Sequence, residues 1–439
     1  MGAGTAQRGA CLLISGKVRK NMEFVVFAGV LLLLFIFMIV QELIQTKNQE
    51  KLFKKYLREN YGKEPPKEYS LERFARLGSY LERHKEEKQL DDITWNDLGM
   101  DEVFRRIDRT YSAAGEEYLY YTLRNISCGR EALEHLEEVV NWLQEQENIK
   151  VRIQLLMKRL GHLGKYSLYD YLDNLDYLGE RSNRKIVLGN LLYLPFLLLL
   201  FVQPAMGTIG IVLCMLWHIM TYFREKKVIE PYIISFAYVL RLIDVCEELE
   251  KQKIPVYRRE LDELREVLKS LRELRRGAYW VMAGNQGKIG GNPLDILADY
   301  LRMILHLDIF QFNRMLEKLR KKTGQVETML AITGYLDMAI SVGGFRKSLE
   351  GYCIPKLEED TEKAFLHMKK GWHPLLSQPV KNSIRADRGI LLTGSNASGK
   401  STFLKMVAVN AVLAQTIHTC AAESYLSLIH ISEPTRHLR

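Results

Sequence analysis

The residues best suited to chemistry in this sequence lie at 394–402, which read GSNASGKST. A glycine separated by four residues from Gly-Lys-Ser has the spacing of a phosphate-binding loop. The glycines allow backbone N–H groups to converge on phosphate oxygens, and a following helix adds partial positive charge. We expect Lys400 to reach the β- and γ-phosphates of ATP and the Ser401 hydroxyl to ligate Mg²⁺. The predicted nucleotide-binding residues are Gly394, Ser395, Asn396, Ala397, Ser398, Gly399, Lys400, Ser401 and Thr402.

The flanks of this loop predict the elements that must position it. Residues 389–392 (GILL) form a short apolar run, which suits a buried strand. Residues 402–413 have helical composition and contain no helix breaker. A strand, a glycine-bounded turn and a helix are the context that a phosphate-binding loop requires. The alternative is an ordinary strand, turn and helix in which these letters occur by chance.

The composition allows a large folded protein and leaves its partner open. The chain has 439 residues, of which 47% are hydrophobic and 26% charged. A formal net charge of +9 is compatible with nucleic acid or with an anionic membrane surface, and it decides between neither. The cysteines are scattered without a C-x-x-C pair, which argues against a zinc site or a disulfide framework and suits a reducing compartment. They are Cys11, Cys128, Cys214, Cys246, Cys353 and Cys420.

The N-terminal region contains a predicted membrane anchor. Residues 24–40 are uncharged and apolar, and with the extension to residue 44 the segment is long enough to span a bilayer. A signal peptide is the alternative, because basic residues occur within the preceding segment 1–23. The apolar stretch is long for a signal peptide, and no small-residue cleavage site follows it. We therefore predict an uncleaved transmembrane helix at 24–44.

A second apolar block, 186–223, predicts a transmembrane helical hairpin. Gln203 and Pro204 interrupt it near the middle, and each half is close to the minimum spanning length. Basic residues flank both ends, so the positive-inside rule places both ends on the cytoplasmic side. We expect a membrane protein whose core and nucleotide-binding regions are cytoplasmic. The alternative is a buried helix pair in a soluble domain.

The remaining chain before the loop has helical patterns at 45–185 and 224–370. Leu133, Leu136, Val140 and Leu143 recur on one helix face. After Pro255, leucines at 261, 264, 268, 271 and 274 form a second stripe, whose other faces carry many arginines among acidic residues. Those arginines could contact DNA, although a solvated mixed-charge face explains them as well. The glycine-rich stretch 283–293 reads as a flexible connection, and a third helical stretch is expected from Pro293 to about Arg346.

Three segments in this order resemble the MutS DNA mismatch repair family. GWHPLL (371–376), PVKN (379–382) and the loop with Asn396 resemble its ATPase domain. Residues 332–355 resemble its lever segment, and residues 90–124 resemble the start of its core domain. The resemblance implies ATP and Mg²⁺ as cofactors, DNA as a partner and a homodimer in the intact protein. It also places Val380 and Asn382 near the adenine, whereas His373 suits either a functional role or a turn before Pro374.

The departures from the family limit what is carried over. The family's mismatch reader is an N-terminal domain, and the region before Leu90 is too short for it and contains the predicted anchor instead. Mismatch recognition is therefore not inferred. The expected fold is mostly α, a helical core and lever with transmembrane helices, followed by an incomplete α/β P-loop domain at 371–425.

The last residues predict an interrupted domain. Residues 426–439 (LSLIHISEPTRHLR) resemble the in-frame translation of a sequencing adapter, and a natural polar tail containing Glu433 is the alternative. A P-loop ATPase needs a downstream acidic residue that holds Mg²⁺ and positions water. We find no apolar strand ending in such an acid, so we expect this chain to bind nucleotide weakly at best without useful hydrolysis. The intact protein is expected to be an ATPase.

The leading hypothesis is a membrane-anchored, MutS-like, ATP-dependent DNA-binding protein. A membrane P-loop ATPase that does not act on DNA is the first alternative. A nucleotide-binding helical scaffold without enzymatic activity is the second.

Overall fold

A computed structural model describes 37–38, 40–41, 44–64, 69, 71–85, 89–126, 129–163, 167–272, 293–358, 364–394 and 399–428. Most of the predicted anchor, the glycine-rich connection and the last eleven residues, 429–439, lie outside these ranges. The chain divides into two compact units, 1–60 and 61–439. In the first unit, residues 44–60 are helical.

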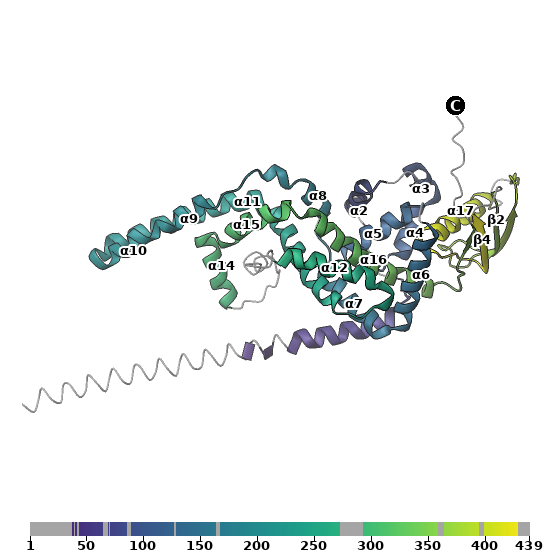
Figure 1. Ribbon diagram of the computed structural model, residues 1–439, viewed down its shortest axis with the longest axis horizontal. Helices are drawn as coiled ribbons and strands as arrows, with labels where there is room; N and C mark the ends of the chain where they lie inside the picture. Colours follow the sequence, from purple (N-terminus) through teal and green to yellow (C-terminus); the bar gives the residue numbers. More distant parts are fainter. Residues whose placement is uncertain are drawn as a thin grey trace, which may run out of the picture. The chain divides into compact units, whose positions relative to one another are not determined.

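The second unit is mostly helical before residue 350, and the paths of its helices can be followed in Figure 1. Its helices before the apolar hairpin are α2 (Leu71–Arg83), α3 (Asp92–Leu98), α4 (Met100–Ile107), α5 (Ala113–Arg124), α6 (Arg130–Glu145), α7 (Glu147–Leu160), α8 (Leu168–Asp173) and the 3₁₀ turn η1 (Leu175–Leu178). The hairpin and later helices are α9 (Arg184–Leu191), α10 (Tyr193–Val202), α11 (Pro204–Glu250), η2 (Pro255–Tyr257), α12 (Arg258–Leu271), α14 (Pro293–Leu305), α15 (Leu307–Arg320) and α16 (Thr323–Ser348).

The face expected for α6, from Leu133 to Leu143, is buried. In α12, Leu261, Leu264 and Leu271 are buried and Leu268 is partly buried, whereas Leu274 lies outside the described residues. The third helical stretch, expected as one, is divided into α14, α15 and α16. The first break is at His306, whose φ of 53° is left-handed and interrupts the helical path.

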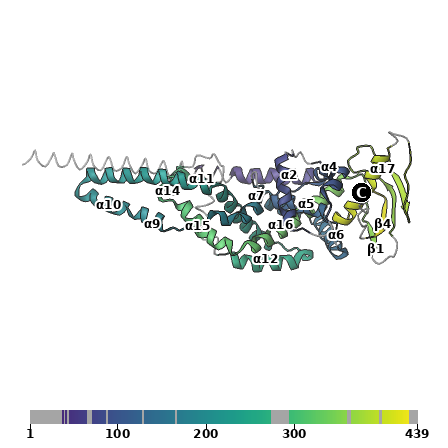
Figure 2. The ribbon, with the colours of Figure 1, turned by 90° about the horizontal axis from the view of Figure 1, so that it is seen from above.

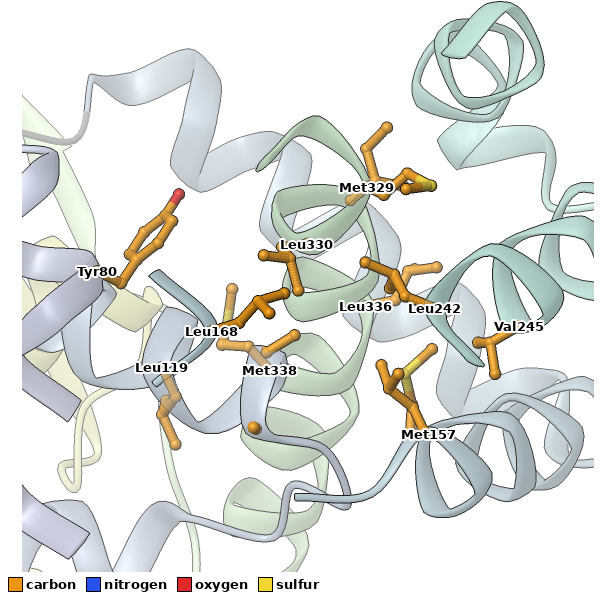
Figure 3. Close-up of a cluster of buried hydrophobic side chains, with 14 of the residues drawn as sticks. Tyr80, Leu119, Met157, Leu168, Leu242, Val245, Met329, Leu330, Leu336 and Met338 are labelled. Atoms are coloured by element: carbon orange, nitrogen blue, oxygen red, sulfur yellow. The ribbon is translucent and has the colours of Figure 1, made fainter. Parts of the chain in front are cut away.

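Helix α16 is the centre of the helical core and packs closely against α5. Figure 3 shows Leu330, Leu336 and Met338 of this helix among side chains from α5, α8 and α11. The Asp337 carboxylate accepts hydrogen bonds from Ser112 N at 2.8 Å and Ser112 Oγ at 2.6 Å, at the start of α5. A Cβ at Gly334 would lie 2.6 Å from the Ala114 carbonyl oxygen, so only glycine permits this approach. The two segments that resemble the lever and the core start therefore contact each other directly.

The apolar block at 186–223 is helical and turns at Gln203. Residues Arg184–Val202 and Pro204–Glu230 are long and apolar enough to cross a membrane, by length and composition. Most of their large apolar side chains are exposed, including Phe201 at 89% and Met220 at 74%. The second helix does not end near Phe223, as the hairpin prediction implied, because α11 continues to Glu250. A third apolar helix, α16, is mostly buried within the protein and serves as a core helix.

A four-stranded sheet follows the helical core. The strands β1 (Lys356–Glu358), β2 (Leu366–Gly371), β3 (Asn382–Ala386) and β4 (Ser424–Leu428) lie in the order β1-β4-β2-β3. β1 and β4 are parallel, and β2 is antiparallel to both of its neighbours. The helix α17 (Lys400–Ile417) packs against this sheet (Figure 2). The sheet thus begins before residue 371, and its β4 includes residues 426–428 of the adapter-like stretch.

The buried strand expected at 389–392 is wrong for this structure. These residues are not in a strand, and Ile390 and Leu391 are 55% and 87% exposed. A strand is stabilised by pairing with a neighbour, and among the described residues β4, the one strand after α17, pairs with β1 and β2 instead. The segment before the loop therefore has no sheet partner in the described part of the chain.

Candidate nucleotide-binding site

The described part of the phosphate-binding loop lies at the N-terminus of α17. Gly399 caps this helix with a left-handed φ of 82°, a conformation that favours glycine. Lys400 Nζ donates a hydrogen bond to the Gly394 carbonyl oxygen, so its side chain folds back over the loop. The four loop residues from Ser395 to Ser398 lie outside the described residues.

The start of α17 has the properties that a phosphate group requires. A helix's first turn leaves backbone N–H groups without intrahelical acceptors, which here belong to Lys400, Ser401 and Thr402. Ser401 and Thr402 are exposed, and apart from its chain neighbours no heavy atom of the described residues lies within 4 Å of a Cβ placed on Gly399. The open backbone, the helix terminus and the lysine together fit a phosphate. Ser401 is placed in this first turn, and its role as a Mg²⁺ ligand stays a prediction.

A buried asparagine on α17 joins this helix to the sheet. Asn410 Nδ2 donates to the Trp372 carbonyl oxygen at 3.0 Å, and Asn410 Oδ1 accepts from Ala421 N at 2.7 Å. Trp372 N also donates to the Ala421 carbonyl oxygen at 2.9 Å. The Asn410 side chain thus links α17 to the residue that follows β2 and to the segment that precedes β4. Sequence reasoning missed Asn410, whose signal is a polar residue within the apolar run of residues 406–414.

His373 lies in the turn that follows β2 and is buried. Its Nδ1 accepts a hydrogen bond from Leu375 N at 3.3 Å, and Leu376 N donates to its carbonyl oxygen at 3.1 Å. Burial lowers the pKa of His373, and the charge of Lys405 on α17 lowers it further. These contacts make His373 a turn residue, and the lowered pKa favours the neutral form of its ring.

The residues predicted near the adenine lie at the exposed end of the sheet. Val380 is 77% exposed, and Asn382 Nδ2 donates a hydrogen bond to the Val380 carbonyl oxygen at 3.0 Å. Between them, Lys381 Nζ lies 4.8 Å from the centroid of the Trp372 ring. The turn is therefore held against the GWHP segment, and its contact with adenine stays a prediction.

The opposite end of α17 is held by an arginine that sequence reasoning also missed. Arg346, in the last turn of α16, is fully buried and binds Glu137 of α6 through contacts of 3.1 and 2.7 Å. It donates to Thr419 Oγ1 at 2.8 Å and to the His418 carbonyl oxygen at 3.0 Å. A cation at a helix C-terminus is favourable because the helix dipole is negative there. We call the contacts of Arg346 with Glu137, Thr419 and His418 the Arg346 joint. They attach α17, which begins at the candidate phosphate site, to the helical core.

Three basic residues of α12 form ion pairs with acidic neighbours, and residues 273–292, which carry further arginines of the predicted stripe, lie outside the described ranges. Arg258 and Arg265 pair with Asp262, and Arg265 also approaches Glu250 at 2.6 Å. Lys269 pairs with Glu266 at 2.6 Å. These exposed pairs support the interpretation as a solvated mixed-charge face rather than a DNA-contacting arm.

Known proteins with sequence similarity belong to the MutS group. The chain is 28% identical to "Probable DNA mismatch repair protein Msh6" of Drosophila melanogaster over 26% of this chain and 10% of that protein. It is 28% identical to human "MutS protein homolog 4" over 26% of this chain and 12% of that protein. It is 33% identical to "DNA mismatch repair protein MutS" of Acholeplasma laidlawii over 24% of this chain and 13% of that protein.

These similarities cover about a tenth to an eighth of each of these relatives' lengths. No family model matches the chain. The similarities support a relation to the MutS family.

Proposed function

We propose that this chain is the nucleotide-binding and lever portion of a MutS-like, ATP-dependent DNA-binding protein that is anchored in a membrane. The carrying observation is the placement of α17. Its N-terminus presents the phosphate-binding residues, and its C-terminus is bound by Arg346 of the core helix α16. ATP with Mg²⁺ is the proposed ligand, and the names of the relatives as DNA mismatch repair proteins suggest DNA as the partner.

The proposed coupling follows from the two ends of α17. A phosphate bound at Lys400 and Ser401 would attract the helix N-terminus and could displace the whole helix along its axis. Such a displacement would change the contacts of Thr419 and His418 with Arg346. Since Arg346 belongs to α16, which also packs against α5, occupancy of the site would bias the arrangement of the core.

Membrane anchoring is supported by the exposed apolar surface of the hairpin. Large side chains such as Leu198, Phe201 and Leu213 point out of the protein over two consecutive helices. A soluble protein rarely exposes a continuous apolar surface of this extent. Arg184 and Lys185 at one end and Arg224 and Lys226 near the other favour placing the core on the cytoplasmic side.

The first experiment tests nucleotide binding by the purified chain in detergent. We expect a fluorescent ATP analogue to bind in the presence of Mg²⁺ and Lys400→Ala to weaken it at least about tenfold, because a charge-assisted contact is lost. Lys158→Ala, an exposed lysine at the end of α7, is the matched control and should leave binding unchanged. Equal affinities for both variants would refute the assignment of the site.

A second experiment separates the DNA-binding proposal from its alternatives. Binding of a labelled duplex should weaken steeply as salt rises, because phosphate contacts release counterions. A chain that binds ATP but no DNA at any salt concentration would favour a membrane ATPase that does not act on DNA. Full DNA binding by Lys400→Ala with no response to ATP would favour a scaffold.

A further inference from the structure

Two cysteines from distant parts of the sequence lie opposite each other beside the Arg346 joint. Cys353 lies between α16 and β1, and Cys420 lies between α17 and β4. Cys353 N donates to the Cys420 carbonyl oxygen at 2.9 Å, and Cys420 N donates to the Cys353 carbonyl oxygen at 3.0 Å. In such an antiparallel pair the Cα atoms are about 5.5 Å apart, which is within the range of disulfides.

The side chains of the pair also lie side by side. Because the two residues lie directly opposite each other, their side chains project from the same face of the pair, and both cysteines are free. The Cys420 thiol donates a hydrogen bond to the Asn410 carbonyl oxygen at 3.5 Å. Cys420 is fully buried in an apolar cluster that includes Leu357 and Met368, whereas Cys353 is partly exposed at its edge. The pair thus consists of one thiol that a small reagent can reach and one that is held behind it.

We infer that Cys353 and Cys420 form a peroxide-responsive, reversible disulfide that ties the end of α16 to the end of α17. The partly exposed Cys353 is the residue oxidised first, and the buried Cys420 resolves it. This inference concerns a modification site and does not depend on nucleotide binding.

The chemistry balances with hydrogen peroxide as the oxidant. The Cys353 thiol releases its proton, the thiolate attacks one peroxide oxygen, and the O–O bond breaks to give a sulfenic acid and hydroxide. The hydroxide takes up the released proton and leaves as water. The Cys420 sulfur then attacks the sulfenic sulfur, the S–S bond forms, the S–O bond breaks and a second water leaves. The two thiols lose two hydrogens and two electrons in total, and these reduce one peroxide to two waters.

The environments of the two thiols agree with this order. The neighbouring Cys420 side chain lowers the pKa of Cys353 and so favours its reactive thiolate, despite partial burial. Burial raises the pKa of Cys420 well above the ordinary value, which keeps it protonated until a sulfenic acid forms beside it.

The backbone geometry favours a labile rather than a permanent bridge. Directly opposite residues with both backbone hydrogen bonds have Cβ atoms about 5 Å apart, whereas a disulfide requires about 3.8 Å. Closing the bond therefore draws the two segments together by about 1 Å. A strained bond of this kind is more easily reduced by thiols.

The test uses the full chain in detergent, reduced, treated with hydrogen peroxide, alkylated and digested with trypsin. We expect a linked pair of the peptides 348–356 and 406–436, lower in mass by two hydrogens than the separate peptides, and its loss on treatment with dithiothreitol. The alkylated forms of both peptides should disappear in parallel. The peptide 242–251, which carries the equally buried Cys246, is the internal control and should remain fully alkylatable.

Two variants and one condition make the test decisive. Cys353→Ser should leave Cys420 reduced, and Cys420→Ala should leave a sulfenic acid on Cys353 that dimedone captures. The inference is overturned if Cys353 is oxidised in the unaltered chain without linking to Cys420. It is also overturned if the same pair links equally well in urea, since native proximity would then not be its cause. The unaltered chain carries the test even if Cys420→Ala does not fold.

Discussion

Replacement of Arg346 by alanine should be one of the most damaging single changes in the described core. Arg346 is fully buried and Glu137 is only 19% exposed, so the pair is shielded from water. Removing one partner of a buried ion pair leaves the other charge uncompensated, at a cost of about 3–5 kcal/mol. The change also leaves the carbonyl groups at the end of α17 without their cationic partner.

The pKa of Glu137 gives a second route to this magnitude. Burial would raise that pKa, but the His418 side chain at 3.6 Å and the hydrogen bonds and charge of Arg346 hold it at about 2 instead of 4.5. The difference corresponds to about 3 kcal/mol. Arg346 supplies only part of it, and the lost hydrogen bonds to Thr419 and the His418 carbonyl add about 1 kcal/mol each. Both routes lead to about 3–5 kcal/mol.

The assay is urea unfolding of the chain in detergent, followed by near-ultraviolet circular dichroism. Arg346→Ala should lower the free energy of unfolding by this amount and accelerate hydrogen exchange in α17. Arg130→Ala, which removes an exposed pair with Glu134, is the control and should cost less than about 1 kcal/mol. The double change Arg346→Met and Glu137→Leu should recover much of the loss, because no buried charge remains.

Acid provides an independent check of the same reasoning. The folded state lowers the pKa of Glu137, so the unfolded state binds the proton more readily. The stabilisation that the ionised Glu137 contributes to the folded state is present above pH 4.5 and is lost as pH falls toward 2. The difference between Arg346→Ala and the unaltered chain should shrink over that window. If Arg346→Ala costs no more than Arg130→Ala, the joint does not hold α17 and the proposed coupling loses its basis.

Two further changes test a buried hydrogen-bonding residue of α17 and a buried carboxyl group of α5. Asn410→Ala should cost about 2–4 kcal/mol in the same urea assay, because Trp372 O and Ala421 N lose their buried partner. The exposed Asn96→Ala in α3 is the control and should cost under about 0.5 kcal/mol. Glu117 is fully buried, and burial raises its pKa to about 8 against the hydrogen bond from Ser167 and the charge of Arg76. The folded state therefore holds this proton more tightly, and stability should decline as pH rises from 4.5 through about 8. Glu117→Gln should remove that decline, and an unchanged pH profile would contradict the assignment.

Short sequence patterns predicted the helix faces, the hairpin turn and the loop, because each of these depends mainly on neighbouring residues in the chain. The 3.6-residue spacing of the leucines in α6 and α12 follows directly from the face that each helix buries. Gln203 followed by Pro204 marked the turn of the hairpin for the same reason, since proline at a helix start is compatible with the missing N–H. The loop at 394–402 was found by spacing, and the structure places its last residues at the start of a helix.

The contacts that make the candidate site depend on distant residues and could not be read in this way. Arg346 resembles any basic residue in the last turn of a helix, and only the fold brings it to Glu137 and to the end of α17. Cys353 and Cys420 are 67 residues apart and match no spacing rule, so the sequence indicated two unrelated thiols. The apolar run at 389–392 failed as a strand because strand formation needs a partner, which apolarity alone does not supply.

The helix α11 connects the apolar hairpin to the core without a loop between them. Its first part carries exposed apolar side chains such as Leu213 and Met220, and its last part buries Phe236 and Leu249. The change coincides with Pro231, which lacks an N–H group and leaves one intrahelical hydrogen bond unmade. A proline in a helix interior is the usual site of a bend. In the proposed membrane-bound form, this point would set the angle between the bilayer and the MutS-like core. The rest of α11 is a continuous helix, so the angle is expected to change mainly at Pro231.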